Sequence, residues 1–247
     1  MISRWKSLLK DAFYRLGLEV RFAAKHDALS VQRKLLAGRN VRTIVDGGAY
    51  HGEWTAHYRR AFPSADVYLF EPFPESQEIL QATFSGDAKS HLVPRAIGER
   101  CESRVLHANK LAATSSLLPV DERVREKLPD PEWVASATEI TVDVTDLDSF
   151  CDETGVRHID LLKLDLQGHE LAALRGARKL LERRAIDLIY TEMLFMPHYV
   201  GQAYHFQICD YLHGHGYQLF GLYNLGVLSS GQMLQADAIF LAPQLQS

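Results

Sequence analysis

The stretch that constrains this chain most is Val41 to Gly52, VRTIVDGGAYHG, in which a short apolar run ends at an acid and is followed by glycines. Residues 43–45 have the β-branched composition of a buried strand. The glycines allow a tight turn in which a ligand can approach the backbone. Because residues 53–62 are compatible with a helix, the stretch predicts a strand, a glycine turn and a helix. In an open α/β sheet such a unit places a ligand at the carboxyl end of the strand.

The spacing of the glycines distinguishes between two nucleotide cofactors. The dinucleotide fingerprint is G-x-G-x-x-G, and Ala49 makes the match to it partial. The pattern D-x-G-x-x-x-G fits without a gap from Asp46 through Gly48 to Gly52, and it is common in enzymes that bind S-adenosylmethionine (SAM), whose cationic groups favour a nearby carboxylate. Glu71 ends the next apolar run and suits the ribose hydroxyls of either cofactor. A purely structural turn is the alternative.

Composition points to one soluble α/β domain. The chain has 247 residues, of which 47% are hydrophobic and 23% charged, and no apolar run approaches the roughly 20 residues that span a bilayer. The formal net charge of −4 gives no general reason to expect a nucleic-acid partner. Cys101, Cys151 and Cys209 form no C-x-x-C motif, and the amino terminus lacks an apolar signal segment, so we expect reduced thiols in a cytoplasmic protein.

The amino-terminal part differs in charge from the rest. Residues 1–42 contain ten Lys or Arg and three Asp or Glu. Apolar residues recur at helical spacing from Ile2 to Leu16, which predicts an amphipathic helix. We expect this helix to pack on the domain or on a second subunit of a homo-oligomer; the alternative is peripheral contact of residues 1–20 with the inner membrane surface. The predicted division is a helical extension, 1–40, and an α/β domain, 41–247.

The rest of the chain alternates strand and helix signals, as expected for a mostly parallel sheet with helices on both faces. Residues 109–138 interrupt the pattern and are expected to form a surface loop or a lid over the site. Predicted strands cover 65–70, 91–97, 104–107, 139–144, 159–164, 186–191, 217–222 and 236–241. Predicted helices cover 28–36, 75–84, 145–154, 168–181 and 202–212.

The most informative later segment is residues 159–177, IDLLKLDLQGHELAALRGA. A buried strand ends near Asp165, Gly168 turns the chain into a helix, and the next strand ends at Glu192. Because the carboxyl ends of neighbouring parallel strands meet at one edge of a sheet, both carboxylates are predicted to lie at the edge that carries the glycine turn.

Several further motifs follow one another in the order typical of one family: IVDGGAYHG at 44–52, LFEPFPES at 69–76, RAIGE at 95–99, the Ser115–Ser116 pair, VTDLDSF at 144–150, D-x-x-G-x-E at 165–170 and IYTE at 189–192. With them the sequence resembles the FkbM family of SAM-dependent methyltransferases. The resemblance implies a class I, Rossmann-like fold with a seven-stranded sheet whose final strand is antiparallel. It also implies O-methylation of a hydroxyl on a sugar of a glycolipid or polysaccharide, or on a natural product. The implied cofactor contacts are Asp46, Gly47, Gly48, Ala49, Gly52, Glu71, Pro72, Ala96, Ile97 and Asp165.

The sequence departs from the family pattern at two places. The turn commonly reads D-V-G-A-N in the family, whereas Gly47 and Tyr50 stand here in place of Val and Asn. The later motif commonly carries Glu before its glycine, and here that residue is Gln167. The substitution removes one negative charge and excludes this residue as a base or as an anionic metal ligand.

Methyl transfer to a hydroxyl needs a group that accepts a proton, and Asp165 is the leading candidate from its position at a strand end. Capping the following helix is its alternative role. Glu192 is the second candidate, or a residue that orients the substrate, and His198 and His205 are the preferred histidines for proton transfer. Asp165 and Glu192 could also ligate Mg²⁺, but we favour a site without metal. Two other histidines lie near the predicted site: His51 is expected to face solvent, and the role of His169 stays open.

Four aromatic residues are expected in the core but could instead stack on a sugar, namely Phe195, Tyr199, Tyr204 and Trp133.

Two other function classes compete with a methyltransferase. An NAD-dependent oxidoreductase would keep Glu71 but should carry glycine at Ala49. A non-catalytic SAM-binding module would keep the turn while tolerating loss of Asp165 and Glu192. A nucleic-acid methyltransferase is disfavoured because the body of the chain is acidic. The expected partner is therefore a small-molecule or glycan hydroxyl.

Overall fold

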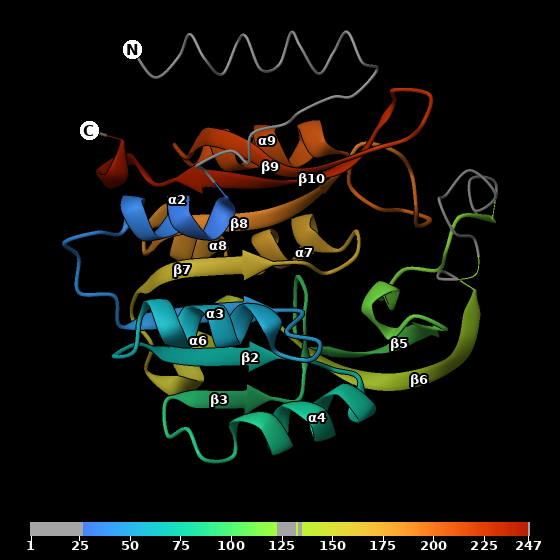
Figure 1. Cartoon of the computed structure of the whole chain (residues 1–247), viewed down its shortest axis with the longest axis horizontal. Helices are drawn as coiled ribbons and strands as arrows, with labels where there is room; N and C mark the ends of the chain where they lie inside the picture. Colours follow the sequence, from blue (N-terminus) through green and yellow to red (C-terminus); the bar gives the residue numbers. More distant parts are fainter. Residues whose placement is uncertain (1–26, 123–131, 133–134, 247) are drawn as a thin grey trace, which may run out of the picture.

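A seven-stranded sheet forms the centre of the molecule (Figure 1). The computed structural model describes residues 27–122, 132 and 135–246. Only the last strand is antiparallel to its neighbours, so the fold is the class I arrangement that the sequence predicted. The strands are β1 (Thr43–Gly47), β2 (Asp66–Phe70), β3 (Ser90–Val93), β7 (Ile159–Leu164), β8 (Ile186–Leu194), β9 (Gln218–Val227) and β10 (Met233–Leu241), and their order in the sheet is β3-β2-β1-β7-β8-β10-β9.

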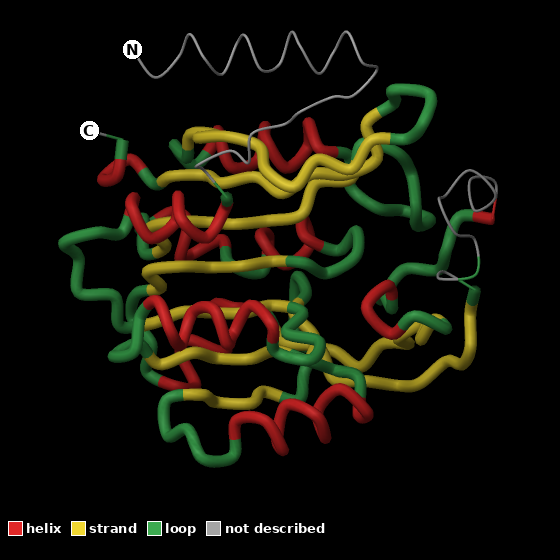
Figure 2. The backbone as a smooth tube through the Cα atoms, viewed as in Figure 1, coloured by secondary structure: helices red, strands yellow, loops and turns green. Residues whose placement is uncertain are grey.

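Helices cover both faces of this sheet, as the tube view shows (Figure 2). One face packs against α2 (Ala28–Leu35), α3 (Glu53–Ala61) and α4 (Pro74–Phe84). The other packs against α6 (Leu147–Thr154), α7 (Glu170–Arg175), α8 (Arg178–Glu182) and α9 (His205–Gly214). Each face has its own apolar core, because the side chains of a strand alternate between the two faces.

The central strands β7 and β8 are buried along their whole length. Their charged residues therefore need partners at the strand ends. At the amino end, Asp160 accepts the N–H groups of Arg42 and Thr43, at 2.8 and 2.9 Å. Asp187 forms an ion pair with Arg39 at 3.1 Å and accepts a hydrogen bond from Gln244, which lies in the final 3₁₀ turn η2 (Pro243–Leu245). These contacts close the edge of the sheet opposite the predicted site.

A second, three-stranded sheet lies beyond the carboxyl ends of β1, β2 and β7 (Figure 1). It consists of β4 (Ala96–Ile97), β6 (Ser136–Thr145) and β5 (Glu102–Asn109), in that order. The sequence predicted one strand over 91–97, and this was wrong. Pro94 interrupts it, the N–H of Arg95 turns back to the carbonyl of Val93 at 2.8 Å, and β4 then pairs with β6 instead of continuing β3.

Two predicted helices differ in extent. The predicted helix 168–181 is divided into α7 and α8, because the chain packs closely at Gly176. The predicted helix 202–212 begins only at His205. In contrast, α6 begins after its Asp146 cap and ends at Thr154, within the predicted range, with Gly155 as its C-cap.

Several predictions concern segments that the structure describes only in part. The amphipathic segment up to Leu16 lies outside the described residues, so the boundary at residue 40 stays a prediction; the described α2 packs on the sheet through Ala28 and Val31. Most of the predicted loop or lid, 123–131 and 133–134, is likewise outside the described residues. All three cysteines are free. Among the described helices, none is long and apolar enough to cross a membrane.

We predict that Gly176→Ala destabilises the fold. A Cβ at this position would lie 2.1 Å from the carbonyl oxygen of Gly98, a backbone atom that cannot rotate away. Overpacking of this kind costs about 1–3 kcal/mol, which corresponds to a fall in melting temperature of roughly 2–4 °C per kcal/mol. The matched control is Gly86→Ala, where a Cβ meets no atom within 4 Å. Thermal melting of both variants checks this, and equal melting temperatures would contradict it.

Candidate functional site

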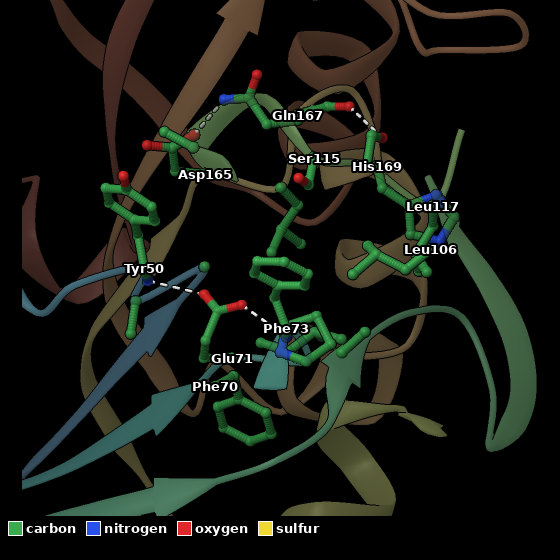
Figure 3. Close-up of a pocket in the computed structure, with 18 of the residues that line it drawn as sticks. Tyr50, Phe70, Glu71, Phe73, Leu106, Ser115, Leu117, Asp165, Gln167 and His169 are labelled. Atoms are coloured by element: carbon green, nitrogen blue, oxygen red, sulfur yellow. Dashed lines mark hydrogen bonds between the residues drawn. The ribbon is translucent and has the colours of Figure 1, made fainter. Parts of the chain in front are cut away.

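A cavity of about 300 Å³ lies at the carboxyl edge of β1, β2 and β7, facing the small sheet (Figure 3). Residues from five strands and their loops line it, so the fold and not one local segment forms its walls. Most of the predicted cofactor contacts are among the lining residues, namely Gly48, Ala49, Glu71, Pro72, Ala96, Ile97 and Asp165.

The glycine turn fits tightly between β1 and β7. Gly48 has a φ of +71°, and a Cβ there would lie 2.0 Å from the carbonyl oxygen of Asp165, so only glycine fits. The N–H groups of Gly48 and Ala49 both donate to the carbonyl of Phe70, at 3.1 and 3.0 Å. These bonds fix the turn to β2, the N–H of Asp165 donates to the carbonyl of Gly47 at 3.1 Å on the β7 side, and Gly48 and Ala49 line the cavity.

Glu71 follows β2 and is buried at the bottom of the cavity. Its carboxylate oxygens accept the N–H groups of Tyr50 at 2.8 Å and Phe73 at 2.9 Å (Figure 3). Burial raises the pKa of Glu71 to about 7, although these two hydrogen bonds and the charge of Lys163 act to lower it. A carboxyl that titrates near neutral pH therefore faces the cavity.

Lys163 is a site residue that sequence reasoning missed. Its ammonium lies 3.1 Å from Oδ1 of Asp46 and 3.9 Å from Oδ2 of Asp165. It also donates to the carbonyl oxygens of Gly47 at 3.1 Å and Gly48 at 2.7 Å. Burial by itself would lower the pKa of Lys163, but the nearby carboxylates outweigh it and the pKa is raised. Lys163 thus stays charged and holds the glycine turn onto β7.

Asp165 and Glu192 are brought together by an amide side chain. Nε2 of Gln167 donates to Oδ1 of Asp165 at 2.8 Å (Figure 3) and to Oε2 of Glu192 at 3.2 Å. Asp165 lines the cavity, and its side chain is 40% exposed. Glu192 is buried behind it and does not line the cavity. Burial, and secondarily the charges of Asp165 and Glu170, raise the pKa of Glu192 well above its usual range.

The turn after Asp165 is held by Glu170, at the start of α7. Its Oε1 accepts the N–H groups of Leu166 at 2.8 Å and Gly168 at 3.2 Å. Burial raises the pKa of Glu170 to about 7, in spite of these hydrogen bonds. His169 lies on the cavity wall, and burial, together with the charge of Arg104, lowers its pKa to about 4. His169 is therefore neutral at physiological pH.

The remaining cavity wall is largely apolar. Phe73 projects into the cavity beside Glu71, and Leu106 and Leu117 lie on the opposite side (Figure 3). Trp54, on the first turn of α3, also lines the cavity. The cavity therefore has an apolar part, and it has acidic groups on the side formed by the carboxyl ends of the strands.

Other residues singled out from the sequence lie away from the cavity walls. Asp46 is fully buried beneath the turn, where it accepts the hydroxyl of Thr55 at 2.6 Å. Gly47 and Gly52 are packing positions against Ile97 and Phe84, respectively. His198 is buried, with Nδ1 2.9 Å from the carbonyl of Met196, and does not line the cavity.

The remaining described histidines and aromatic residues that were singled out from the sequence do not line the cavity either. His51 stacks on Tyr50 with ring centroids 3.7 Å apart, and His205 stacks on Phe195 at 4.5 Å. The hydroxyl of Tyr199 lies 2.9 Å from Oε1 of Gln167. Tyr204 is exposed next to α9, and Trp133 lies outside the described residues.

A metal ion is not favoured by the groups at the cavity. The N–H groups of Gln167 occupy the space between the Asp165 and Glu192 carboxylates, where a shared cation would sit. Among the described residues, the one His and Asp cluster with metal-binding spacing is His158, Asp160 and Asp187, at the opposite edge of the sheet. Its carboxylates already accept protein N–H donors.

Lys163 had a signal in the sequence, because it is the one cation in the buried strand IDLLKL. Leu106, on β5 of the small sheet, and Leu117, which packs with it, had none, since nothing local shows that a segment folds over the site. Ser116, which donates to the carbonyl of Gln167 at 2.7 Å, was singled out only within the serine pair.

Comparison with known proteins finds the same family that the sequence resembles. The family model described as the methyltransferase FkbM domain matches residues 46–219. The chain is 26% identical over 162 residues to the 2-O-methyltransferase NoeI of Sinorhizobium fredii, covering 64% of this chain and 66% of that protein. It is 28% identical over 153 residues to the methyltransferase sdnD of Sordaria araneosa, covering 54% of this chain and 59% of that protein. The matches span less than two thirds of these relatives.

A solved structure shares the fold. The methyltransferase FkbM from Methylobacillus flagellatus superposes with a TM-score of 0.51 at 16% identity, over 82% of this chain and 44% of that chain. At this identity the similarity concerns the fold alone.

We predict that Lys163→Met lowers the free energy of unfolding by about 3–5 kcal/mol, because removing one partner of a buried ion pair leaves the other charge unpaired. The uncompensated group is Asp46, whose side chain is 0% exposed. The double variant Asp46→Asn, Lys163→Met should recover part of this loss, since it removes both charges. Lys179→Met, at an exposed position, is the control and should change stability by less than about 0.5 kcal/mol. Urea unfolding measures all three, and a Lys163→Met variant as stable as the control would contradict the assignment.

Proposed function

Because the chain belongs to the FkbM methyltransferase family, we propose that it transfers a methyl group from SAM to a hydroxyl of a sugar or natural-product acceptor. The observation that carries the proposal is the cavity where the glycine turn, Glu71 and Asp165 meet. The whole protein's activity is proposed and not inherited, because the matches span less than two thirds of the curated relatives.

The residues that line the cavity fit SAM. Its volume of about 300 Å³ lies at the lower end of the range for ligand pockets. Glu71 would accept the ribose hydroxyls, and the turn at Gly48 and Ala49 would lie along the methionine end. The apolar compartment around Phe73 and Ile97 suits the adenine base. Ala49 in place of a glycine makes NAD the poorer fit.

When bound, SAM supplies an electrophilic methyl group on its sulfonium. The protein must then align the acceptor oxygen with that methyl group. It must also accept the proton that the acceptor hydroxyl loses. Alignment contributes up to about 7–11 kcal/mol in favourable cases. Tyr50 lies on the same side of the cavity as Asp165 (Figure 3) and, with Trp54, which also lines the cavity, would position the acceptor.

Asp165 is the proposed base. It combines a position on the cavity wall with partial exposure, so a hydroxyl can reach it. Glu192 is buried behind it with a raised pKa, which suits a protonated neighbour and not a base. His198 hydrogen bonds within its own turn and does not line the cavity, so its position does not support a role in proton transfer.

The acceptor class rests on a relative. NoeI is named a 2-O-methyltransferase, which favours oxygen as the acceptor atom. A non-catalytic SAM-binding module is the second candidate function. The specific observation in its favour is that Gln167 replaces the acid common in the family; the retention of Asp165 at the cavity wall favours catalysis instead.

We predict that S-adenosylhomocysteine raises the melting temperature and that NAD does not. A ligand at about 100 times its dissociation constant stabilises a protein by ~2.7 kcal/mol, and each kcal/mol shifts melting by roughly 2–4 °C at this chain length. A shift with NAD alone would overturn the family-based assignment of the cofactor.

The same measurement at pH 8 and pH 6 tests the role of Glu71. Because its folded-state pKa is raised to about 7, the free protein loses stability as pH rises through this range, and ribose hydroxyls that bind the carboxylate offset that loss. The shift caused by S-adenosylhomocysteine should therefore be larger at pH 8. In Glu71→Gln it should be small at both pH values. Glu170 titrates in the same range but does not line the cavity, so it affects free and bound protein alike.

A transfer assay with SAM labelled in its methyl group tests the acceptor. We expect label on sugar hydroxyls, presented free and lipid-linked, and none on amines or RNA. Asp165→Ala should reduce the rate by roughly 10²- to 10⁴-fold, the usual contribution of a general base. Label on an amine or on RNA, or an unchanged rate in Asp165→Ala, would refute this part of the proposal.

A further inference from the structure

Within the described part of the chain, Gln167 is the amide side chain that meets two carboxyl groups. Its Nε2 donates to Asp165 at 2.8 Å and to Glu192 at 3.2 Å, while its Oε1 lies 2.9 Å from the hydroxyl of Tyr199. In this orientation the carboxylate of Asp165 faces an N–H group, whereas the reversed amide would place its oxygen against a carboxylate oxygen of Asp165. The hydroxyl of Tyr199 lies 2.9 Å from both this amide oxygen and the carbonyl oxygen of Thr114, and it reinforces the orientation when its proton points to the amide.

The backbone at this position is strained. Gln167 has a φ of +52°, in the left-handed region that glycine adopts freely and other residues adopt at a cost. The hydroxyl of Ser116 holds the conformation by donating to the carbonyl of Gln167 at 2.7 Å. A glycine would adopt the same backbone conformation without strain, so the strain indicates that the side chain has a role.

The amide leaves Asp165 with one oxygen for a ligand. Oδ1 already accepts a hydrogen bond from Nε2 of Gln167. Oδ2 has no hydrogen bond among the described residues, and the ammonium of Lys163 lies 3.9 Å away from it. Because Asp165 lines the cavity, a carboxylate fixed through Oδ1 presents Oδ2 in a defined direction. A glutamate at 167 would instead place a third carboxyl beside Asp165 and Glu192 and could donate at most one hydrogen bond.

We propose that Gln167 is a positioning residue, whose amide, oriented by Tyr199, directs the carboxylate of Asp165 toward the cationic centre of the cofactor. The inference rests on the proposed function, because it needs SAM in the cavity and Asp165 beside its sulfonium. It assigns to the amide a task that an acid at the same position does not perform.

Two cofactor analogues test this without knowledge of the acceptor. Sinefungin carries an amine in the region of the sulfonium methyl and is cationic there, whereas S-adenosylhomocysteine is neutral at its sulfur. The ratio of their dissociation constants therefore measures the negative charge near the reacting centre, and a general packing defect affects both ligands alike. Isothermal titration of both ligands is carried out on the wild type, Asp165→Ala, Gln167→Leu and the double variant. Gln218→Leu, on the exposed start of β9, is the matched control.

We expect the wild type and Gln218→Leu to prefer sinefungin equally, and Asp165→Ala to lose that preference. Gln167→Leu should reduce it by roughly 3- to 10-fold, the effect of losing one hydrogen bond of ordinary strength, because the carboxylate of Asp165 is still present but is no longer oriented. In the Asp165→Ala background, Gln167→Leu should have no further effect on the ratio, because there is no carboxylate left to position. Tyr199→Phe should lower the preference in the same direction by a smaller factor, and it replaces Gln167→Leu if melting shows that variant to be unfolded.

The inference is overturned if Gln167→Leu weakens both ligands by the same factor, or if its effect persists in the Asp165→Ala background. Either result would give Gln167 a purely structural role in its turn. A wild type that binds neither ligand would instead refute the proposed cofactor. A wild type that binds both without preference, or an Asp165→Ala variant that keeps the preference, would refute the placement of Asp165 beside the sulfonium and with it the inference.

Discussion

The buried ammonium of Lys163 is the interaction on which the rest of the site depends. It contacts Asp46 on β1 and the carbonyl oxygens of Gly47 and Gly48, and it lies 3.9 Å from Asp165. A charge buried in a continuous apolar strand is costly unless it is paired and hydrogen bonded. The partners of Lys163 are the glycine turn and the two strands that carry the site, so satisfying this charge also fixes the geometry of the cavity edge.

Around this cation the protein concentrates acids. Glu71 and Glu170 both have pKa values raised to about 7, and burial is the main cause in each case. Their hydrogen bonds go largely to backbone N–H groups of the turns that border the cavity, which orders those turns. An acidic surrounding of this kind favours a cationic ligand such as SAM. The same crowding of acids gives the neutral amide of Gln167 its place between Asp165 and Glu192.

Local signals were sufficient for much of the fold. The β-branched run at 43–45, the stretch IDLLKL and the capped segment after Asp146 each became the predicted element, because burial and capping act over a few residues. The errors lie where distant parts meet. Strand 91–97 was broken because β6, more than forty residues away in sequence, pairs with Ala96 and Ile97. The predicted helix 168–181 was divided because Gly176 packs on the carbonyl of Gly98.

The sequence by itself determined the sheet with its glycine turn, the positions of Glu71 and Asp165, and the family resemblance, because these depend on residue types at short spacings. Only the tertiary structure decided which candidates share the cavity. It placed Asp46 beneath the turn and Glu192 behind Asp165, left His198 bonded within its own loop, and brought Lys163 and the small sheet to the site. The physical reason is that the partner of a buried charge, and the segment that covers a cavity, are set by strand pairing across the whole chain and not by neighbours in sequence.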